Sequence, residues 1–199
     1  MFEFQDQVVI VTGSGSPKGI GRTIARTFAK QGAVVIIADM NEEGIKDTVA
    51  VIEEEGGKAM GITVNVTSPE SVQQMADTIM EKYGRIVNLS SVSGKRGGGV
   101  FGGAHYSASK AAVLAFSKNL SREISAEGIT INSVCPGLIN TEIWKSLPKE
   151  DADKVIDGIP MGRPGETQEV ANAILFLASK EASYITGEEI DVNGGSHMD

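Results

Sequence analysis

A tyrosine and a lysine stand four residues apart near the start of a helical stretch, at Tyr106 and Lys110 of residues 106–125. Residues at i and i+4 share one face of a helix, so the phenol and the ammonium can reach each other or one common ligand. A tyrosine beside a fixed cation loses its proton more readily than its free pKa of about 10 allows, as a general acid or base near neutrality requires. The pair therefore predicts a proton-transfer site. The alternative is a solvated surface pair, which is frequent on helices.

Serines that follow a predicted strand could complete such a site. Ser91 lies at the carboxyl end of the predicted strand 85–89, where its hydroxyl can hold a substrate oxygen near Tyr106. Ser90 and Ser93 are alternatives for the same role. We expect Ser91 to bind the oxygen to which the tyrosine transfers its proton.

A glycine-rich segment, TGSGSPKGIG over residues 12–21, directly follows the predicted strand 8–11 and opens the predicted helix 20–30. Backbone amides and the positive end of the helix dipole then face the place where a pyrophosphate would sit. Asp39 closes the second predicted strand, where a carboxylate can accept both ribose hydroxyls of adenosine and repel a 2′-phosphate. This context predicts a dinucleotide site for NAD in preference to NADP. The alternatives are a turn that binds nothing and, for Asp39, a helix cap.

The composition fits one globular domain that works on a small molecule. The chain has 199 residues, 41% hydrophobic and 22% charged, so we predict one domain over residues 1–199. With 26 acidic against 18 basic residues, it lacks the positive surface of a nucleic-acid binder or of a protein that binds anionic membranes. We therefore expect a small-molecule partner, no nucleic acid and no membrane.

Cysteine, histidine and the N-terminal residues bear on disulfides, metal sites and the location of the protein. Cys135 is the only cysteine, so the chain has no internal disulfide and no cysteine-cluster zinc site. His105 has no second histidine or carboxylate at ligand spacing and His197 lies near the last residue, so we predict no metal site. The N-terminus lacks a signal-peptide pattern, and no apolar run approaches the ~18 residues that cross a bilayer. These features predict a cytoplasmic protein.

Strand and helix patterns alternate along the chain. Buried strands are predicted at 8–11, 33–38, 59–66, 85–89, 130–134 and 189–192, and helices at 20–30, 42–55, 69–82, 106–125 and 167–178. Strict alternation predicts an α/β fold, a doubly wound parallel sheet with ligands beyond the carboxyl ends of its strands. The polar segment 140–165 has no clear period, which makes it a candidate substrate-side lid or a plain surface excursion.

Five motifs in this order resemble the short-chain dehydrogenase/reductase family, with greatest similarity to its 3-oxoacyl-ACP-reductase-like and sugar-alcohol dehydrogenase branches. They are TGSGSPKGIG, Asp39 after the second strand, IVNLSS, YSASK, and NSVCPG followed by Thr141. The resemblance implies a Rossmann-like oxidoreductase that interconverts a secondary alcohol and a ketone with NAD(H). It implies that Tyr106 is the acid/base, that Lys110 binds the nicotinamide ribose and lowers the tyrosine pKa, and that Ser91 polarises the substrate oxygen.

The resemblance also implies a set of cofactor contacts. The glycine motif of this chain has two more residues than that of the family, so we expect a bulge near Ser16 and Pro17. Asn65 stands where the family has an aspartate facing adenine, and we expect its amide oxygen to accept the same hydrogen bond. Besides Asp39, Tyr106 and Lys110, the implied contacts are Thr12, Gly13, Ser14, Ser16, Gly19, Ile20 and Gly21 at the phosphates, Asn65 and Val66 at adenine, and Pro136, Gly137, Ile139 and Thr141 at nicotinamide.

One departure from the family is large. Between EKYG and RIVNLSS the family has a strand ending in NNAG and two helices, one of which carries an asparagine of the catalytic tetrad. The chain is therefore short by roughly 50 residues. We expect the strand 86–89 to pair directly with 8–11 in a six-stranded sheet, which would displace the catalytic residues and weaken turnover. The alternative function is a nucleotide-binding or assembly-only variant with impaired catalysis. The family also implies a homo-oligomer, a dimer or a tetramer.

Overall fold

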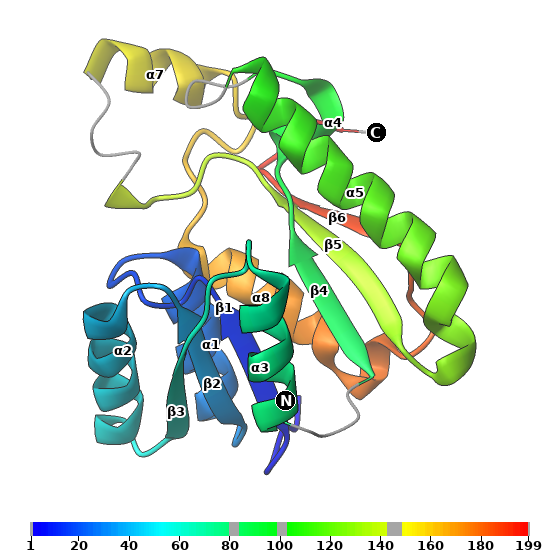
Figure 1. Ribbon diagram of the computed structural model, residues 1–199. Helices are drawn as coiled ribbons and strands as arrows, with labels where there is room; N and C mark the ends of the chain where they lie inside the picture. Colours follow the sequence, from blue (N-terminus) through cyan, green and yellow to red (C-terminus); the bar gives the residue numbers. More distant parts are fainter. Residues whose placement is uncertain (1, 80–83, 99–102, 143–148, 199) are drawn as a thin grey trace. The chain divides into compact units, whose positions relative to one another are not determined.

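The computed structural model describes residues 2–79, 84–98, 103–142 and 149–198 (Figure 1). By its internal contacts the chain divides into two compact units, Met1–Tyr83 and Gly84–Asp199. In the described residues, no helix is both long enough and apolar enough to span a membrane. The prediction of one domain over residues 1–199 stays a prediction.

The first unit is a three-stranded parallel sheet in the order β1-β2-β3, with α1 and α2 packed against it. Its middle strand is β-branched and buried, Val35 and Ile37 completely so, because strands flank it on both sides. The elements of this unit are β1 (Val8–Thr12), α1 (Ile20–Lys30), β2 (Val34–Asp39), α2 (Glu42–Glu54), β3 (Lys58–Thr63) and α3 (Pro69–Ile79).

The second unit is a parallel sheet in the order β4-β5-β6, and every residue of its middle strand is buried. The long helix α5 lies along this sheet, and α8 packs against all three of its strands (Figure 1). The elements are β4 (Arg85–Leu89), α4 (Val92–Arg96), α5 (Ala104–Ile124), η1 (Ser125–Glu127), β5 (Thr130–Pro136), α7 (Lys149–Asp157), α8 (Thr167–Ala178), η2 (Lys180–Ala182) and β6 (Glu189–Val192).

These elements confirm the prediction of an α/β, Rossmann-like fold with parallel strands. Two helices were not predicted. Helix α7 lies within the polar segment 140–165, where only Ala152, Val155 and Ile156 supply a half-buried apolar stripe, too short to show a period. Helix α4 spans five residues directly after β4, which is shorter than any periodic signal. Part of the glycine loop after α4, residues 99–102, lies outside the described residues.

The expected pairing of β1 with β4 would join the two units, and it stays a prediction. Within its own unit, β1 pairs with β2 and β4 pairs with β5. Each observed pair is joined by its own crossover, which contains α1 in one case and α4 and α5 in the other, and such local connections set strand neighbours. Each unit thus contains one described sheet of three strands.

Candidate cofactor and catalytic sites

The glycine-rich loop is built by backbone geometry in the first unit. Gly13 follows β1 with φ at +68°, a left-handed conformation that favours glycine, and its N–H donates to the carbonyl of Ala38 at 2.8 Å. Gly21 lies in the first turn of α1, and a Cβ there would overlap the carbonyl oxygen of Gly13. Helix α1 therefore begins directly against the loop that follows Thr12 at the end of β1.

The residues of the loop differ in exposure: those at 16–18 are exposed and Ser14 turns inward. Ser14 is fully buried, and its hydroxyl donates to the carbonyl of Val11 at 2.6 Å. The predicted contact of Ser14 with a phosphate would therefore be made by its backbone. The two extra residues of the motif are accommodated in a turn in which the N–H of Gly19 donates to the Ser16 carbonyl at 3.1 Å. Gly19 is the N-cap of α1 and offers no side-chain acceptor to the first-turn amides near Ile20. An anion is the natural partner for such amides.

Asp39 is held against this loop at the end of β2. One carboxylate oxygen accepts the N–H of Gly15 at 2.8 Å, and the other accepts the N–H groups of Met40 and Asn41 at 2.8 and 3.1 Å. It is not the cap of α2, because Asn41 caps that helix by accepting the N–H of Gly44. A carboxylate has about four acceptor positions, so three occupied positions leave room for one ribose hydroxyl instead of the expected two.

The predicted adenine contacts lie in the turn after β3. The amide oxygen of Asn65 accepts both the N–H and the hydroxyl of Thr67, at 3.0 and 2.7 Å. Two donors already use this oxygen, so binding the amino group of adenine would require one of these hydrogen bonds to be given up, and the adenine contact stays a prediction. Val66 is 61% exposed, and Met40, which sequence reasoning missed, is 66% exposed at the end of the neighbouring strand. An apolar residue directly after Asp39 was the available signal.

The proton-transfer pair is assembled at the start of α5 in the second unit. The ammonium nitrogen of Lys110 donates to the carbonyl of Leu89 at 3.0 Å and lies 5.8 Å from the centre of the Tyr106 ring. Tyr106 and Lys110 are half-buried, as the i, i+4 spacing predicts for one shared helix face. The strand end thus holds the cation beside the phenol.

Ser91 is the N-cap of α4, and its hydroxyl oxygen accepts the N–H of Ser93 at 3.2 Å. The hydroxyl proton of Ser91 is not used in that bond and can be donated to a ligand. Ser90 is a weaker candidate for substrate contact, because its own hydroxyl donates to the Lys110 carbonyl at 2.8 Å. Helices α4 and α5 pack closely: a Cβ on Gly94 would lie 2.7 Å from the carbonyl carbon of Lys110.

The predicted nicotinamide contacts follow β5. Pro136 ends the strand, and the N–H of Gly137 donates to the Val192 carbonyl at 3.0 Å. Ile139 is buried and pairs with Gly165 in a parallel bridge, so its side chain faces the interior of the unit. Thr141 is half-buried at the start of the candidate lid, whose residues 143–148 lie outside the described ranges. In this turn, backbone groups are therefore the better candidates for ligand contact.

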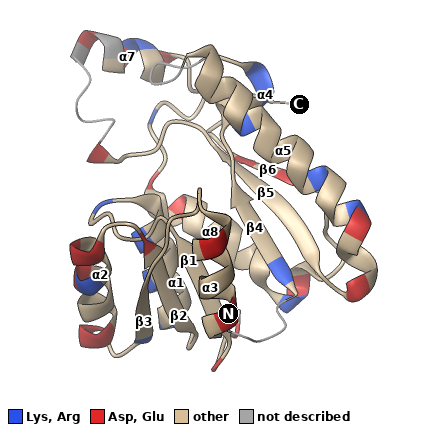
Figure 2. Cartoon of the chain, in the orientation of Figure 1, with Lys and Arg blue, Asp and Glu red and all other residues tan. Residues whose placement is uncertain are grey.

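Electrostatics make Cys135 an unreactive thiol. It is fully buried in β5, and burial, followed by the negative charges of Asp191 and Glu189, raises its pKa to about 11. Lys95, at the basic end of α4 (Figure 2), forms ion pairs with both carboxylates. No three metal-ligating side chains converge anywhere in the described parts of the chain.

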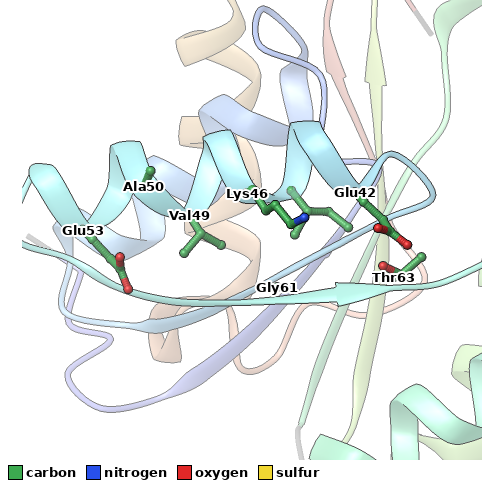
Figure 3. A pocket seen from close by; sticks show the side chains of 8 residues that line it. Glu42, Lys46, Val49, Ala50, Glu53, Gly61 and Thr63 are labelled. Carbon is green, nitrogen blue, oxygen red and sulfur yellow. The ribbon is translucent and has the colours of Figure 1, made fainter.

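A cavity of about 510 Å³ opens between α2 and β3 (Figure 3). Gly61 supplies no side chain there, and a Cβ on it would overlap Ile45. None of the predicted cofactor residues lines this cavity, which is bounded by Glu42, Ile45, Lys46, Val49, Ala50, Glu53, Gly61 and Thr63.

Comparisons with known proteins match nearly the whole chain. A "short chain dehydrogenase" family model matches residues 7–85, and an "Enoyl-(Acyl carrier protein) reductase" model matches residues 76–197. The 3-oxoacyl-[acyl-carrier-protein] reductase of Escherichia coli K12 is 33% identical over 248 residues, covering 98% of this chain and 99% of the relative. The Vibrio cholerae enzyme of the same name is 32% identical over 247 residues, covering 98% of both chains.

A solved structure agrees with these matches. The crystal structure of a 3-oxoacyl-[acyl-carrier protein] reductase from Brucella melitensis superposes with a TM-score of 0.91 at 27% identity, covering 99% of this chain and 93% of that one. The relatives named here are all reductases, so the comparisons lend no support to an assembly-only variant.

The alignment also gives the size of the shortening. At least 49 of its 248 positions have no residue in this chain of 199, in agreement with the predicted loss. The two family models overlap over residues 76–85, which run from the last residues of α3 to the first residue of β4. The prediction that the missing residues would stand between EKYG and RIVNLSS stays a prediction.

Proposed function

Because the chain belongs to the short-chain dehydrogenase/reductase family and is an oxidoreductase, we propose that it interconverts a 3-oxoacyl thioester and its secondary alcohol with NAD(H). A sugar or polyol ketone is the second substrate class. The observation that carries the proposal is the fixed triad of Leu89 carbonyl, Lys110 ammonium and Tyr106 ring, at 3.0 and 5.8 Å. The names of the relatives support the acyl substrate.

The residues of the chain fit a nicotinamide dinucleotide. A Cβ on Gly21 would overlap the Gly13 carbonyl, so glycine lets α1 begin directly against the loop, and the first-turn amides of α1 are without a side-chain cap. Asp39 keeps an acceptor position, and Met40 and Val66 offer apolar surface at the ends of neighbouring strands. When bound, the cofactor supplies the hydride equivalent that ends on the carbonyl carbon.

The preference for NAD follows from the residues after β2. Positions 39–43 read Asp-Met-Asn-Glu-Glu and contain no cation. A 2′-phosphate in this neighbourhood would meet the Asp39 carboxylate, which three backbone N–H groups hold in place. Like-charge repulsion at short range then disfavours NADP.

Side chains of this protein carry out the proton transfer. The Tyr106 phenol gives its proton to the substrate oxygen during reduction, and the neighbouring Lys110 ammonium stabilises the phenolate that remains. The ammonium cannot swing away freely, because the Leu89 carbonyl accepts one of its hydrogens. Ser91 donates its hydroxyl proton to the same substrate oxygen and thereby polarises the carbonyl.

The test is turnover of a 3-oxoacyl thioester by the purified chain and by Tyr106→Phe. The substitution keeps the ring and removes the proton, so we expect kcat to fall by about 10²-fold or more while NADH binding, followed by fluorescence, stays nearly unchanged. Tyr184→Phe is the matched control, because Tyr184 is fully exposed. A Tyr106→Phe variant that keeps most of its activity would contradict the assignment of the acid/base.

We also propose that the protein is a homo-oligomer, because the family resemblance implies a dimer or a tetramer. We propose the cytoplasm as its location. Light scattering of the purified chain measures its mass directly. A mass of 20.9 kDa at micromolar concentration would contradict the oligomer.

A further inference from the structure

Ser90 is buried between β4 and α5, and its hydroxyl also interacts with the Cys135 thiol. Two further hydrogen bonds of Ser90 reach β5 and α5. Its N–H donates to the Val134 carbonyl at 2.8 Å, which extends the ladder between β4 and β5 by one residue. Its hydroxyl donates to the Lys110 carbonyl at 2.8 Å. The residue is 3% exposed, so water does not compete well for this hydroxyl.

Lys110 is thereby held at both ends by consecutive residues of one strand end. The Leu89 carbonyl accepts from its ammonium at 3.0 Å, and the Ser90 hydroxyl donates to its backbone carbonyl. Gly94 adds a steric limit, since a Cβ there would lie 2.7 Å from the same carbonyl carbon. A one-residue slide or a rotation of α5 would break the two polar contacts and press the helix against α4.

We propose that Ser90 is a positioning residue, which fixes the rotation and register of α5 at Lys110 and so the placement of its ammonium beside Tyr106. This inference rests on the proposed function of the Tyr106 and Lys110 pair. Ser90 touches no reacting atom in this proposal. It acts through the Lys110 backbone.

The same strand and helix carry a matched control. Asn88 donates to the Ser117 hydroxyl at 2.8 Å, and that hydroxyl donates to the Val113 carbonyl at 2.7 Å. Ser117 is as buried as Ser90 and also joins β4 to α5, but it lies two turns further along the helix. Ser90→Ala and Ser117→Ala therefore each remove a buried hydroxyl that joins the region of β4 to α5, and only the first lies at Lys110.

The decisive readout is the ionisation of Tyr106. In a background where the chain's other two tyrosines are phenylalanine, phenolate absorbance near 295 nm follows Tyr106 alone. We expect Ser90→Ala to move the midpoint of this titration to higher pH, because a less firmly held ammonium stabilises the phenolate less. Ser117→Ala should leave the midpoint in place, although both variants melt at lower temperature than the parent.

Kinetics supply a second readout. A displacement of the order of 1 Å can cost about 10²-fold in rate, and a partial loss of fixation should lower kcat by about 10-fold with little change in KM. Equal kcat values and equal titration midpoints for the two alanine variants would overturn the role of Ser90. If the parent chain reduces no ketone, the proposed function fails, and the absorbance comparison still decides whether Ser90 positions the pair.

Discussion

Replacing Lys95 by methionine should destabilise the second unit strongly. The Lys95 ammonium lies 3.0 Å from an oxygen of Asp191 and 3.8 Å from an oxygen of Glu189. The three side chains are 7%, 22% and 12% exposed, so the cluster is largely withdrawn from water. The other oxygen of Asp191 is buried and has no hydrogen-bond partner among the described residues, which makes Asp191 dependent on the lysine.

The magnitude follows from what the substitution leaves behind. Breaking a buried ion pair by removing one partner costs about 3–5 kcal/mol, because the remaining charge stays buried without compensation. Glu189 keeps Lys118 at 2.7 Å, so we expect the lower end, about 3 kcal/mol of unfolding free energy. For a chain of this size each kcal/mol corresponds to roughly 2–4 °C, which gives a Tm lower by about 6–12 °C.

Urea unfolding followed by circular dichroism measures this loss. Lys154→Met is the control, because its pair with Glu150 at 2.9 Å is exposed and should be worth less than about 0.5 kcal/mol. The double variant Lys95→Met/Asp191→Leu removes both charges and should recover much of the stability. A Lys95→Met variant within about 0.5 kcal/mol of the parent, or a double variant less stable than the single one, would refute the reasoning.

Three further predictions concern the cofactor, acid stability and the thiol. Asp39→Ala should reduce the preference for NAD over NADP, and an unchanged ratio of kcat/KM values would contradict the proposed specificity. Hydrogen bonds from Arg163, then from a backbone N–H, lower the pKa of Glu169 from 4.5 to about 2. Its stabilisation is therefore complete above pH 4.5 and is lost as the pH falls toward 2. The urea midpoint of Glu169→Gln should accordingly change less with pH over that range than the midpoint of the parent. A variant whose midpoint falls as steeply with acid as that of the parent would argue against the pair. With its pKa raised to about 11 by burial, Cys135 should resist iodoacetamide at pH 8 until the chain unfolds, and rapid labelling of the native chain would show otherwise.

The sequence predicts most of the elements because their signals are local. Runs of β-branched residues mark the strands, and the buried β2 and β5 fall where two-sided apolar patterns stand. Helix α8 has the predicted bounds, Thr167–Ala178. Helices α4 and α7 escape prediction because one is short and the other shows little apolar period.

The candidate sites are predictable in identity but not in hydrogen bonding. Spacing alone places Tyr106 and Lys110 on one face, as the structure has them. Spacing does not show that Ser90 holds the Lys110 carbonyl or that Thr67 occupies the amide oxygen of Asn65. Such contacts depend on which chain segments pack together, and the residue pattern of one segment does not identify the segments that pack against it.

Strands β1 and β4 show what a hydrophobic pattern leaves open. Val8 to Val11 are apolar at every position, a pattern typical of a strand with neighbours on both sides and helices on both faces. Within its own unit, each of β1 and β4 has one strand neighbour. The alignment with the Escherichia coli relative has at least 49 positions that this chain lacks. The apolar pattern of β1 therefore predicts a second strand neighbour without identifying it, because burial is recorded in the sequence of one strand and the identity of its partner is not.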